Sequence, residues 1–216
     1  MSSSDGATYA PVPRPQPVVS EGEFPFAVMH LDHGHIFGMT EGLIGAGGTL
    51  TWVYDPIPER AAAFKEKFPQ VRIASSEAEV LEDPSVILVA SAAVTNERCA
   101  LGLRVIEAGK DYFTDKAPLT TLEQLEAARE ATARTGRKYA VYYSERIHVE
   151  AAVMAGQLVE QGAIGKVVQF LGLGPHRIGA PDSRPDWFWG KERYGGLLCD
   201  IGSHNMEPLL SSTAST

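Results

Sequence analysis

From Phe24 onward, short apolar runs alternate with amphipathic stretches, and this alternation most constrains the fold. The apolar runs predict strands at 26–29, 50–54, 71–74, 86–90, 112–114 and 139–143. The stretches between them predict helices at 36–44, 58–68, 97–108 and 122–135. The run at 85–90 is apolar almost throughout, as in a parallel strand covered on both faces. We therefore expect an α/β fold with a doubly wound parallel sheet built by right-handed crossovers.

After Tyr143 the pattern changes. A helix is predicted at 150–161, a glycine turn at 162–165, a strand at 166–173 and a long loop at 174–194. These elements would open a second α/β domain, but the chain then ends in Ser and Thr residues with no apolar pattern. The predicted organisation is a flexible Ser- and Pro-rich arm at 1–23, the sheet domain at 24–144, an incomplete second domain at 145–210 and a disordered tail at 211–216.

The composition of the chain limits the kinds of molecule that it is expected to bind. The net charge of −8 argues against nucleic acid or an anionic membrane as the main partner, so a small-molecule ligand is expected. The two cysteines, Cys99 in a helix and Cys199 in a buried strand or turn, do not form a disulfide framework and are expected to be buried thiols. No segment has the pattern of a signal peptide or a membrane span, so we expect a cytoplasmic protein.

The turn after the first strand is where such a sheet binds a pyrophosphate, through glycines and a helix N-terminus. Here the segment 30–38 reads His-Leu-Asp-His-Gly-His-Ile-Phe-Gly, and the G-x-G-x-x-G spacing is absent. The amides near Gly34 still offer hydrogen bonds to an anion. Asp55, at the end of the second strand, is placed to bind a ribose 2′-hydroxyl and favour NAD over NADP, or else to stabilise the turn before Pro56.

The same turn has other interpretations. Imidazoles and a carboxylate from His30, Asp32, His33 and His35 could bind a metal ion, which would fit a metal-dependent hydrolase. Loop histidines more often bond to the backbone. A third interpretation is that protonated histidines replace the missing glycine amides as donors to an anion.

Two further segments indicate chemistry. Thr114-Asp115-Lys116-Ala117-Pro118 closes an apolar strand and places a lysine at its carboxyl end. In the segment 194–205, Asp200 and His204 are four residues apart, which on a helix puts a carboxylate and an imidazole on one face, as for a general base and its orienting acid. The two side chains could instead cap a helix or satisfy a buried hydrogen bond.

The loop before this segment is a candidate substrate-binding element. His176, Arg177 and Trp187 offer an imidazole, a cation and a large ring, and Tyr143 follows a strand end. The alternative is that the tryptophan packs the loop down and the arginine is solvated.

Four segments together resemble the Gfo/Idh/MocA family, named for glucose-fructose oxidoreductase, inositol dehydrogenase and a rhizopine-catabolism protein. They are 54–60, 108–116, 162–167 and 195–205, and their order and spacing match from Phe24 to about Leu210. The resemblance implies a Rossmann domain binding NAD, with NADP less favoured, and a second domain that shelters a sugar or polyol. It also implies hydride transfer between a carbinol carbon and nicotinamide, and homo-oligomers in a full-length form.

The resemblance also implies roles for individual residues. Lys116 would stabilise the developing alkoxide, His204 would accept the hydroxyl proton, and Asp200 would place the substrate or tune the imidazole. The implied cofactor-binding residues are Asp32, His33, Gly34, His35, Asp55, Ala90, Ser91, Asp115 and Lys116.

The chain departs from the family pattern in several places. Asp115 replaces a glutamate, Ala117 replaces a proline, and Pro208 lies where the helix bearing His204 should continue. Since the sheet of the second domain is also missing, we expect a C-terminally truncated or frameshifted product. A nucleotide-binding or regulatory protein without turnover is the main alternative to an enzyme.

Overall fold

The computed structural model describes residues 16–172, 179 and 184–213, which fall into two units. The sheet unit contains the described residues of Pro15–Tyr142 and Pro185–Gly195, and the helical unit contains the described residues of Tyr143–Arg184 and Gly196–Thr216. None of the helices in these ranges is long and apolar enough to cross a bilayer.

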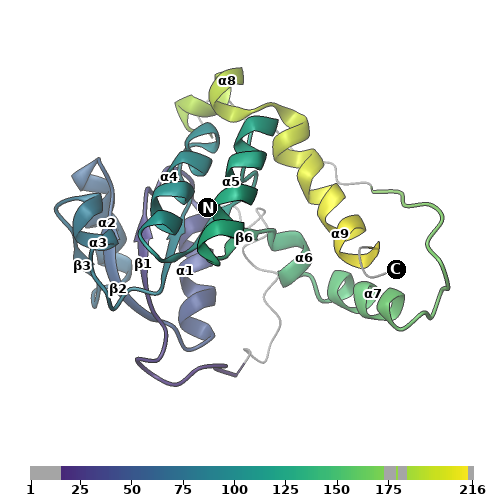
Figure 1. Cartoon of the computed structure of the whole chain (residues 1–216), viewed down its shortest axis with the longest axis horizontal. Helices are drawn as coiled ribbons and strands as arrows, with labels where there is room; N and C mark the ends of the chain where they lie inside the picture. The colour runs from purple at the N-terminus through teal and green to yellow at the C-terminus, as the bar shows by residue number, and fades with distance from the viewer. Residues whose placement is uncertain (1–15, 173–178, 180–183, 214–216) are drawn as a thin grey trace. The chain divides into compact units, whose positions relative to one another are not determined.

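The sheet unit is built on six parallel strands in the order β3-β2-β1-β4-β5-β6 (Figure 1). The strands are β1 (Pro25–Met29), β2 (Thr49–Tyr54), β3 (Arg72–Ile73), β4 (Leu88–Ser91), β5 (Asp111–Asp115) and β6 (Tyr139–Tyr142). The helices between them are α1 (His35–Gly45), α2 (Pro58–Lys67), α3 (Glu77–Leu81), α4 (Arg98–Glu107) and α5 (Leu122–Thr135). The predicted doubly wound, Rossmann-like sheet is confirmed.

The core lies on both faces of this sheet because successive strand residues point to opposite sides. In β1, Phe26 and Val28 pack with α1 and α2, whereas Ala27 and Met29 pack with α3, α4 and α5. All four side chains are fully buried. A strand buried on both faces explains the near-continuous apolar runs of the sequence.

Helix boundaries follow local chemistry. The hydroxyls of Ser76 and Thr121 cap α3 and α5 by accepting hydrogen bonds from the N–H groups three residues later. Pro58 begins α2, where its missing N–H has no consequence. Gly136 ends α5 with φ 68°, a left-handed conformation that glycine adopts without strain. Each of these helix ends is thus set by a residue whose side chain or backbone suits that position.

Short elements complete the sheet unit. The 3-10 turn η1 (Thr95–Glu97) leads into α4, and η3 (Asp186–Trp189) and α8 (Lys191–Tyr194) come from the segment predicted as a long loop. Of that predicted loop, residues 185–194 are therefore partly helical and belong to the sheet unit.

The helical unit contains α6 (Ser144–His148), α7 (Glu150–Glu160), the π-helical turn η4 (Leu198–Gly202) and α9 (Ser203–Thr213). Within this unit α9 packs against α6 and α7. The helix α9 continues through Pro208, where the sequence predicts an interruption.

Two predictions for this part of the chain are wrong. Residues 166–172 form no strand, and Val168 and Leu171 are 91% and 77% exposed. A strand needs a neighbour to pair with its backbone, and the described part of this unit contains no strand at all. Cys199 lies in the π-helical turn and is partly exposed, whereas Cys99 is buried in α4 as predicted.

Candidate functional site

The strand order identifies the edge of the sheet where a ligand is expected. β1 and β4 are central neighbours, and the order reverses between them. Doubly wound sheets bind ligands at the carboxyl ends of the strands beside this reversal. Because the strands are parallel, the turn after β1 and the ends of β4 and β5 lie at that edge. The residues predicted for the cofactor that lie there are Asp32, His33, Gly34, His35, Ala90, Ser91, Asp115 and Lys116.

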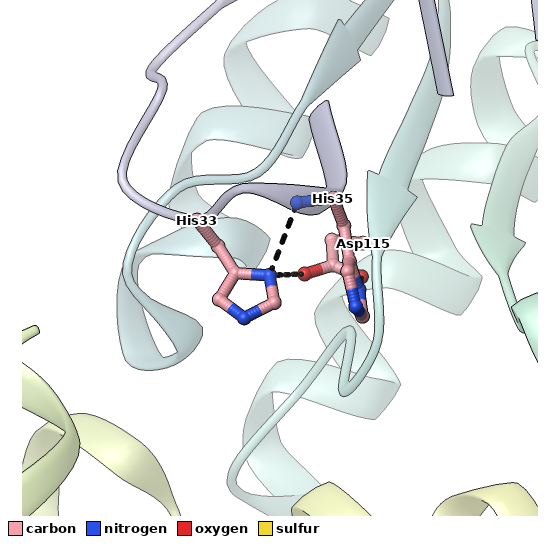
Figure 2. Close-up of side chains that lie close together, drawn as sticks. All are labelled: His33, His35 and Asp115. Carbon is pink, nitrogen blue, oxygen red and sulfur yellow. Dashed lines mark hydrogen bonds and ion pairs between the residues drawn. The ribbon is translucent and has the colours of Figure 1, made fainter. Parts of the chain in front are cut away.

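The carboxylate of Asp115, at the end of β5, is the hub of this edge (Figure 2). Its Oδ1 accepts hydrogen bonds from Nδ1 of His35 (2.9 Å) and from the backbone N–H of Lys116 (2.8 Å). Its Oδ2 accepts from Nδ1 of His33 (3.0 Å) and from the Arg98 guanidinium (3.1 Å). These four donors match the four lone-pair positions of a carboxylate, so Asp115 is saturated.

Asp115 is ionised at neutral pH in this setting. Burial by itself raises the pKa of the carboxyl, but the charge of Arg98, the charge of a protonated His35 and the hydrogen bonds from both imidazoles outweigh it. They hold the pKa of Asp115 well below its usual value. Since an ionised carboxylate only accepts hydrogen bonds, the proton in each histidine contact lies on Nδ1.

The two histidine rings are thereby fixed in one tautomer. The His35 backbone N–H lies 3.5 Å from Nδ1 of His33, at the outer limit of a hydrogen bond, so the 3.0 Å contact with Asp115 decides the proton position. Burial lowers the pKa of His33 despite the neighbouring Asp115, which leaves this ring neutral at neutral pH. Among the described residues no hydrogen-bond partner is recorded for either Nε2.

Arg98, which sequence reasoning missed, supports this hub from the first turn of α4. Its side chain has no exposed surface. Besides the ion pair with Asp115, it donates hydrogen bonds to the carbonyls of Ala93 (2.7 Å), Lys116 and Ala117 (3.1 Å). The signal that could have revealed it is its position three and seven residues before Leu101 and Val105, on the apolar face of the helix.

The guanidinium of Arg98 therefore fixes the backbone that carries Lys116. Lys116 directly follows β5, is 7% exposed, and is joined to Ala117 by a cis peptide bond. Its N–H and its carbonyl are both bound, to Asp115 and Arg98. The position of the lysine is thus set by a buried network.

The structure does not assemble the metal site that the histidine turn suggested. His30 pairs with Glu77 of α3 (2.8 Å) and Asp32 pairs with Arg60 of α2 (2.6 Å), so only His33 and His35 remain together. With Asp115 they place one ligand atom each within 4.8 Å of one another. However, the carboxylate is saturated and bound to Arg98, which disfavours a second cation.

Asp55 has the role of a turn residue. Its side chain has no exposed surface, and its two oxygens accept the backbone N–H groups of Leu31 (2.7 Å) and Ile57 (2.8 Å). The bond from Ile57 stabilises the turn at Pro56, which is the alternative to ribose binding that the sequence left open for Asp55. The ribose contact of Asp55 stays a prediction.

Ala90 and Ser91, at the end of β4, are fully buried. The Ser91 hydroxyl accepts the N–H of Ala93 (3.1 Å), and Ala90 belongs to the core with α1 and α2. The side chains of these two residues are therefore buried beneath this edge of the sheet and not exposed on it.

Trp187 lies against the turn after β1. The tryptophan is buried, its Nε1 donates to the carbonyl of Asp32 (3.3 Å), and its ring centroid is 6.3 Å from that of His33. This packing agrees with the alternative in which the tryptophan anchors its loop. His176 and Arg177, also predicted for substrate binding, lie outside the described residues.

In the helical unit, the predicted Asp200–His204 pair spans two kinds of helix. Asp200 lies in the π-helical turn and His204 in the first turn of α9, so the spacing of an ideal α-helix does not apply. The His204 ring meets Tyr143 edge-on with centroids 5.6 Å apart. Tyr143 also lines an open pocket of about 350 Å³ with Ser203, Met206, Glu207 and Leu210.

Comparison with protein families covers both units. Residues 28–143 match an oxidoreductase family with an NAD-binding Rossmann fold, and residues 153–213 match a GFO/IDH/MocA C-terminal domain. D-xylose dehydrogenase of Paenarthrobacter nicotinovorans is 30% identical over 58% of this chain and 33% of its own. The scyllo-inositol 2-dehydrogenase (NAD(+)) of Bacillus subtilis is 28% identical over 74% and 45%. The chain spans less than half the length of these relatives.

Solved structures agree with the fold. A protein from Erwinia carotovora atroseptica, described as an oxidoreductase, is 47% identical with a TM-score of 0.83, over 89% of this chain and 57% of that one. Levoglucosan dehydrogenase, solved with NADH and levoglucosan, is 20% identical with a TM-score of 0.71, over 88% and 54%. At 20% identity, the similarity to levoglucosan dehydrogenase shows only that the two proteins share a fold.

Proposed function

The chain belongs to the Gfo/Idh/MocA family of oxidoreductases, and we propose that it transfers hydride between NAD and a hydroxyl or carbonyl group of a sugar or polyol. The observation that carries the proposal is Lys116, held by the buried Arg98–Asp115 network at the carboxyl edge of a Rossmann sheet. The relatives named as dehydrogenases of D-xylose and scyllo-inositol support the substrate class.

The residues at this edge fit a dinucleotide. A Cβ atom added to Gly34 would meet nothing within 4 Å, so the turn leaves open space where a phosphate would approach. The N–H groups of Asp32, His33 and Gly34 have no hydrogen-bond partner recorded among the described residues and precede the N-terminus of α1. When bound, the nicotinamide ring supplies the carbon that accepts or donates the hydride.

Each proposed catalytic residue has one task. Lys116 carries a positive charge that stabilises the substrate oxygen as its proton leaves. His204 removes that proton, and Asp200 places the substrate or tunes the imidazole. In the alternative assignment, Lys116 instead of His204 accepts the proton of the hydroxyl group.

The cellular setting is part of the proposal. Neither Cys99 nor Cys199 forms a disulfide, which agrees with a reducing compartment such as the cytoplasm. We also propose that a longer form of the protein assembles as a homo-oligomer.

Titration with NADH, followed by the fluorescence of the three tryptophans, tests cofactor binding, and a panel of sugars and polyols with NAD tests turnover. Saturable binding with turnover of at least one compound supports the proposal. Saturable binding without turnover would favour the regulatory alternative, and absence of binding would refute both.

A further inference from the structure

The turn after β1 has imidazoles where glycines usually allow the backbone to approach a phosphate. Figure 2 shows His33 and His35 beside Asp115, which ends β5 and binds both rings. Because β4 lies between β1 and β5 in the sheet, the two histidines span the end of β4. They stand at the reversal of the strand order, where the diphosphate of a dinucleotide is expected.

We infer that His33 and His35 form a proton-coupled anion site: binding of the cofactor diphosphate draws a proton from solvent onto this pair. The inference rests on the proposed function, because it concerns how the same site holds NAD. It assigns the histidines to binding and not to hydride transfer.

The hydrogen bonds of the pair decide which atoms can meet the anion. Both Nδ1 atoms donate to Asp115, so Nε2 is the remaining polar atom of each ring. The two nitrogens of an imidazole point in divergent directions, so Nε2 is directed away from the carboxylate. A neutral Nε2 presents a lone pair and repels a phosphate oxygen, whereas a protonated Nε2 donates a hydrogen bond to it.

The charge of the cluster makes the proton necessary. Asp115 carries one negative charge, and Arg98, 3.1 Å away, cancels it. With both rings neutral, the cluster of Arg98, Asp115 and the two histidines has no net charge of its own to hold a diphosphate. Burial lowers the pKa of His33, which keeps that ring unprotonated until an anion arrives. Asp115 behind the rings then stabilises the imidazolium, as the carboxylate does in other carboxylate–histidine pairs.

Two other charged groups near the pair are engaged elsewhere: Asp32 is bound to Arg60 of α2, and His30 is bound to Glu77 of α3. The charged side chain of Lys116 comes from the residue directly after Asp115 and β5. From β6, Tyr142 meets the His35 ring edge-on at 6.1 Å, and Trp187 meets His33.

The pair has room for one proton. The ring centroids of His33 and His35 are 4.2 Å apart, so two imidazolium ions would repel each other strongly. Only one negative charge, on Asp115, faces both rings. We therefore expect an uptake of about one proton for each NADH bound.

The test is calorimetric titration of NADH in buffers of different ionisation enthalpy between about pH 7 and 8.5, which counts the protons taken up. With an uptake of one proton, the dissociation constant rises about tenfold per pH unit. Adenosine, which has no phosphate, should bind without uptake. The double variant His33→Gln/His35→Gln should bind NADH more weakly and independently of pH, and His30→Asn, whose partner is Glu77, should keep the uptake.

The outcomes separate this inference from the proposed function. Saturable NADH binding without proton uptake would overturn the inference and leave the function standing. Uptake that persists in the double variant, or that adenosine also causes, would assign the proton to another group and overturn it as well. Absence of NADH binding at every pH would refute the function and with it the inference. The proton count on the unmodified protein requires no variant to fold.

Discussion

Arg98 and Asp115 form a buried ion pair, 3.1 Å long, that joins the start of α4 to the end of β5. Neither side chain is more than 1% exposed. The pair lies behind His33, His35 and Lys116 and contacts all three through Asp115 or through the backbone. The three residues His33, His35 and Lys116, all proposed to act on one ligand, are therefore positioned by a single desolvated interaction.

Replacing Arg98 should be strongly destabilising. Arg98→Met keeps much of the side-chain volume but leaves Asp115 buried without its counter-ion and three carbonyls without a donor. We expect the free energy of unfolding, measured in urea, to fall by about 3–5 kcal/mol. Arg129→Ala is the control, because Arg129 is 70% exposed and its bond to Glu126 should contribute about 0.5 kcal/mol. A loss below about 1 kcal/mol in Arg98→Met would show that the pair contributes little.

The stability of the unliganded protein should depend on pH through His33. Its pKa in the folded protein is lowered, so the folded state binds fewer protons than the unfolded state as the pH falls past about 6.5. The contribution is complete above that pH and is lost below it. Urea unfolding at about pH 7.5 and 5.5 should therefore show a smaller pH effect in His33→Gln than in the unmodified protein. An equal pH effect in both proteins would contradict the proposed state of His33.

Two glycine substitutions should have opposite effects. A Cβ at Gly102 of α4 would lie 2.6 Å from the buried Tyr112 ring and 2.8 Å from Tyr139. Gly102→Ala should lower the free energy of unfolding by about 1–3 kcal/mol through overpacking. Gly42, in the interior of α1, has no atom within 4 Å of the same position. Gly42→Ala should raise stability by about 0.5–1 kcal/mol, and a loss there would show an unseen constraint.

Turnover should depend on Lys116 and His204. Lys116→Ala should reduce the turnover rate by about 100- to 1,000-fold through loss of charge stabilisation, and His204→Ala by about 100- to 10,000-fold. The affinity for NADH should be retained in both, and Lys65→Ala, at an exposed position of α2, is the control. The rates are measured as NADH formation with the best substrate of the panel. Activity retained in both variants would reject the assigned roles.

The sequence allowed the sheet to be predicted because buried parallel strands are apolar almost throughout. The run ending at Ala90 became β4, one residue further along, and the helix at 122–135 was predicted to the residue. α3 was missed because it has only five residues and one buried side chain, Val80. The strand expected at 166–173 was wrong because an apolar run cannot reveal whether a neighbour is present to pair with it.

The sequence allowed several residues of the candidate site to be predicted, but not the hydrogen bonds that join them. Asp115 and the histidine turn were identified separately, one after a strand and the other at the predicted phosphate turn. That His33 and His35 both bind Asp115 depends on the order of β1, β4 and β5, which brings residues 80 apart in sequence into contact. Arg98 was missed because it lies in a helix that reads as apolar and amphipathic.

The most direct test of the central claim is NADH titration followed by the backbone amide resonances of the isotopically labelled chain. The account predicts saturable shifts in the turn at 32–35 and at Asp115 and Lys116, on the same edge of the sheet. The absence of saturable shifts, or shifts confined to residues away from this edge, would contradict it.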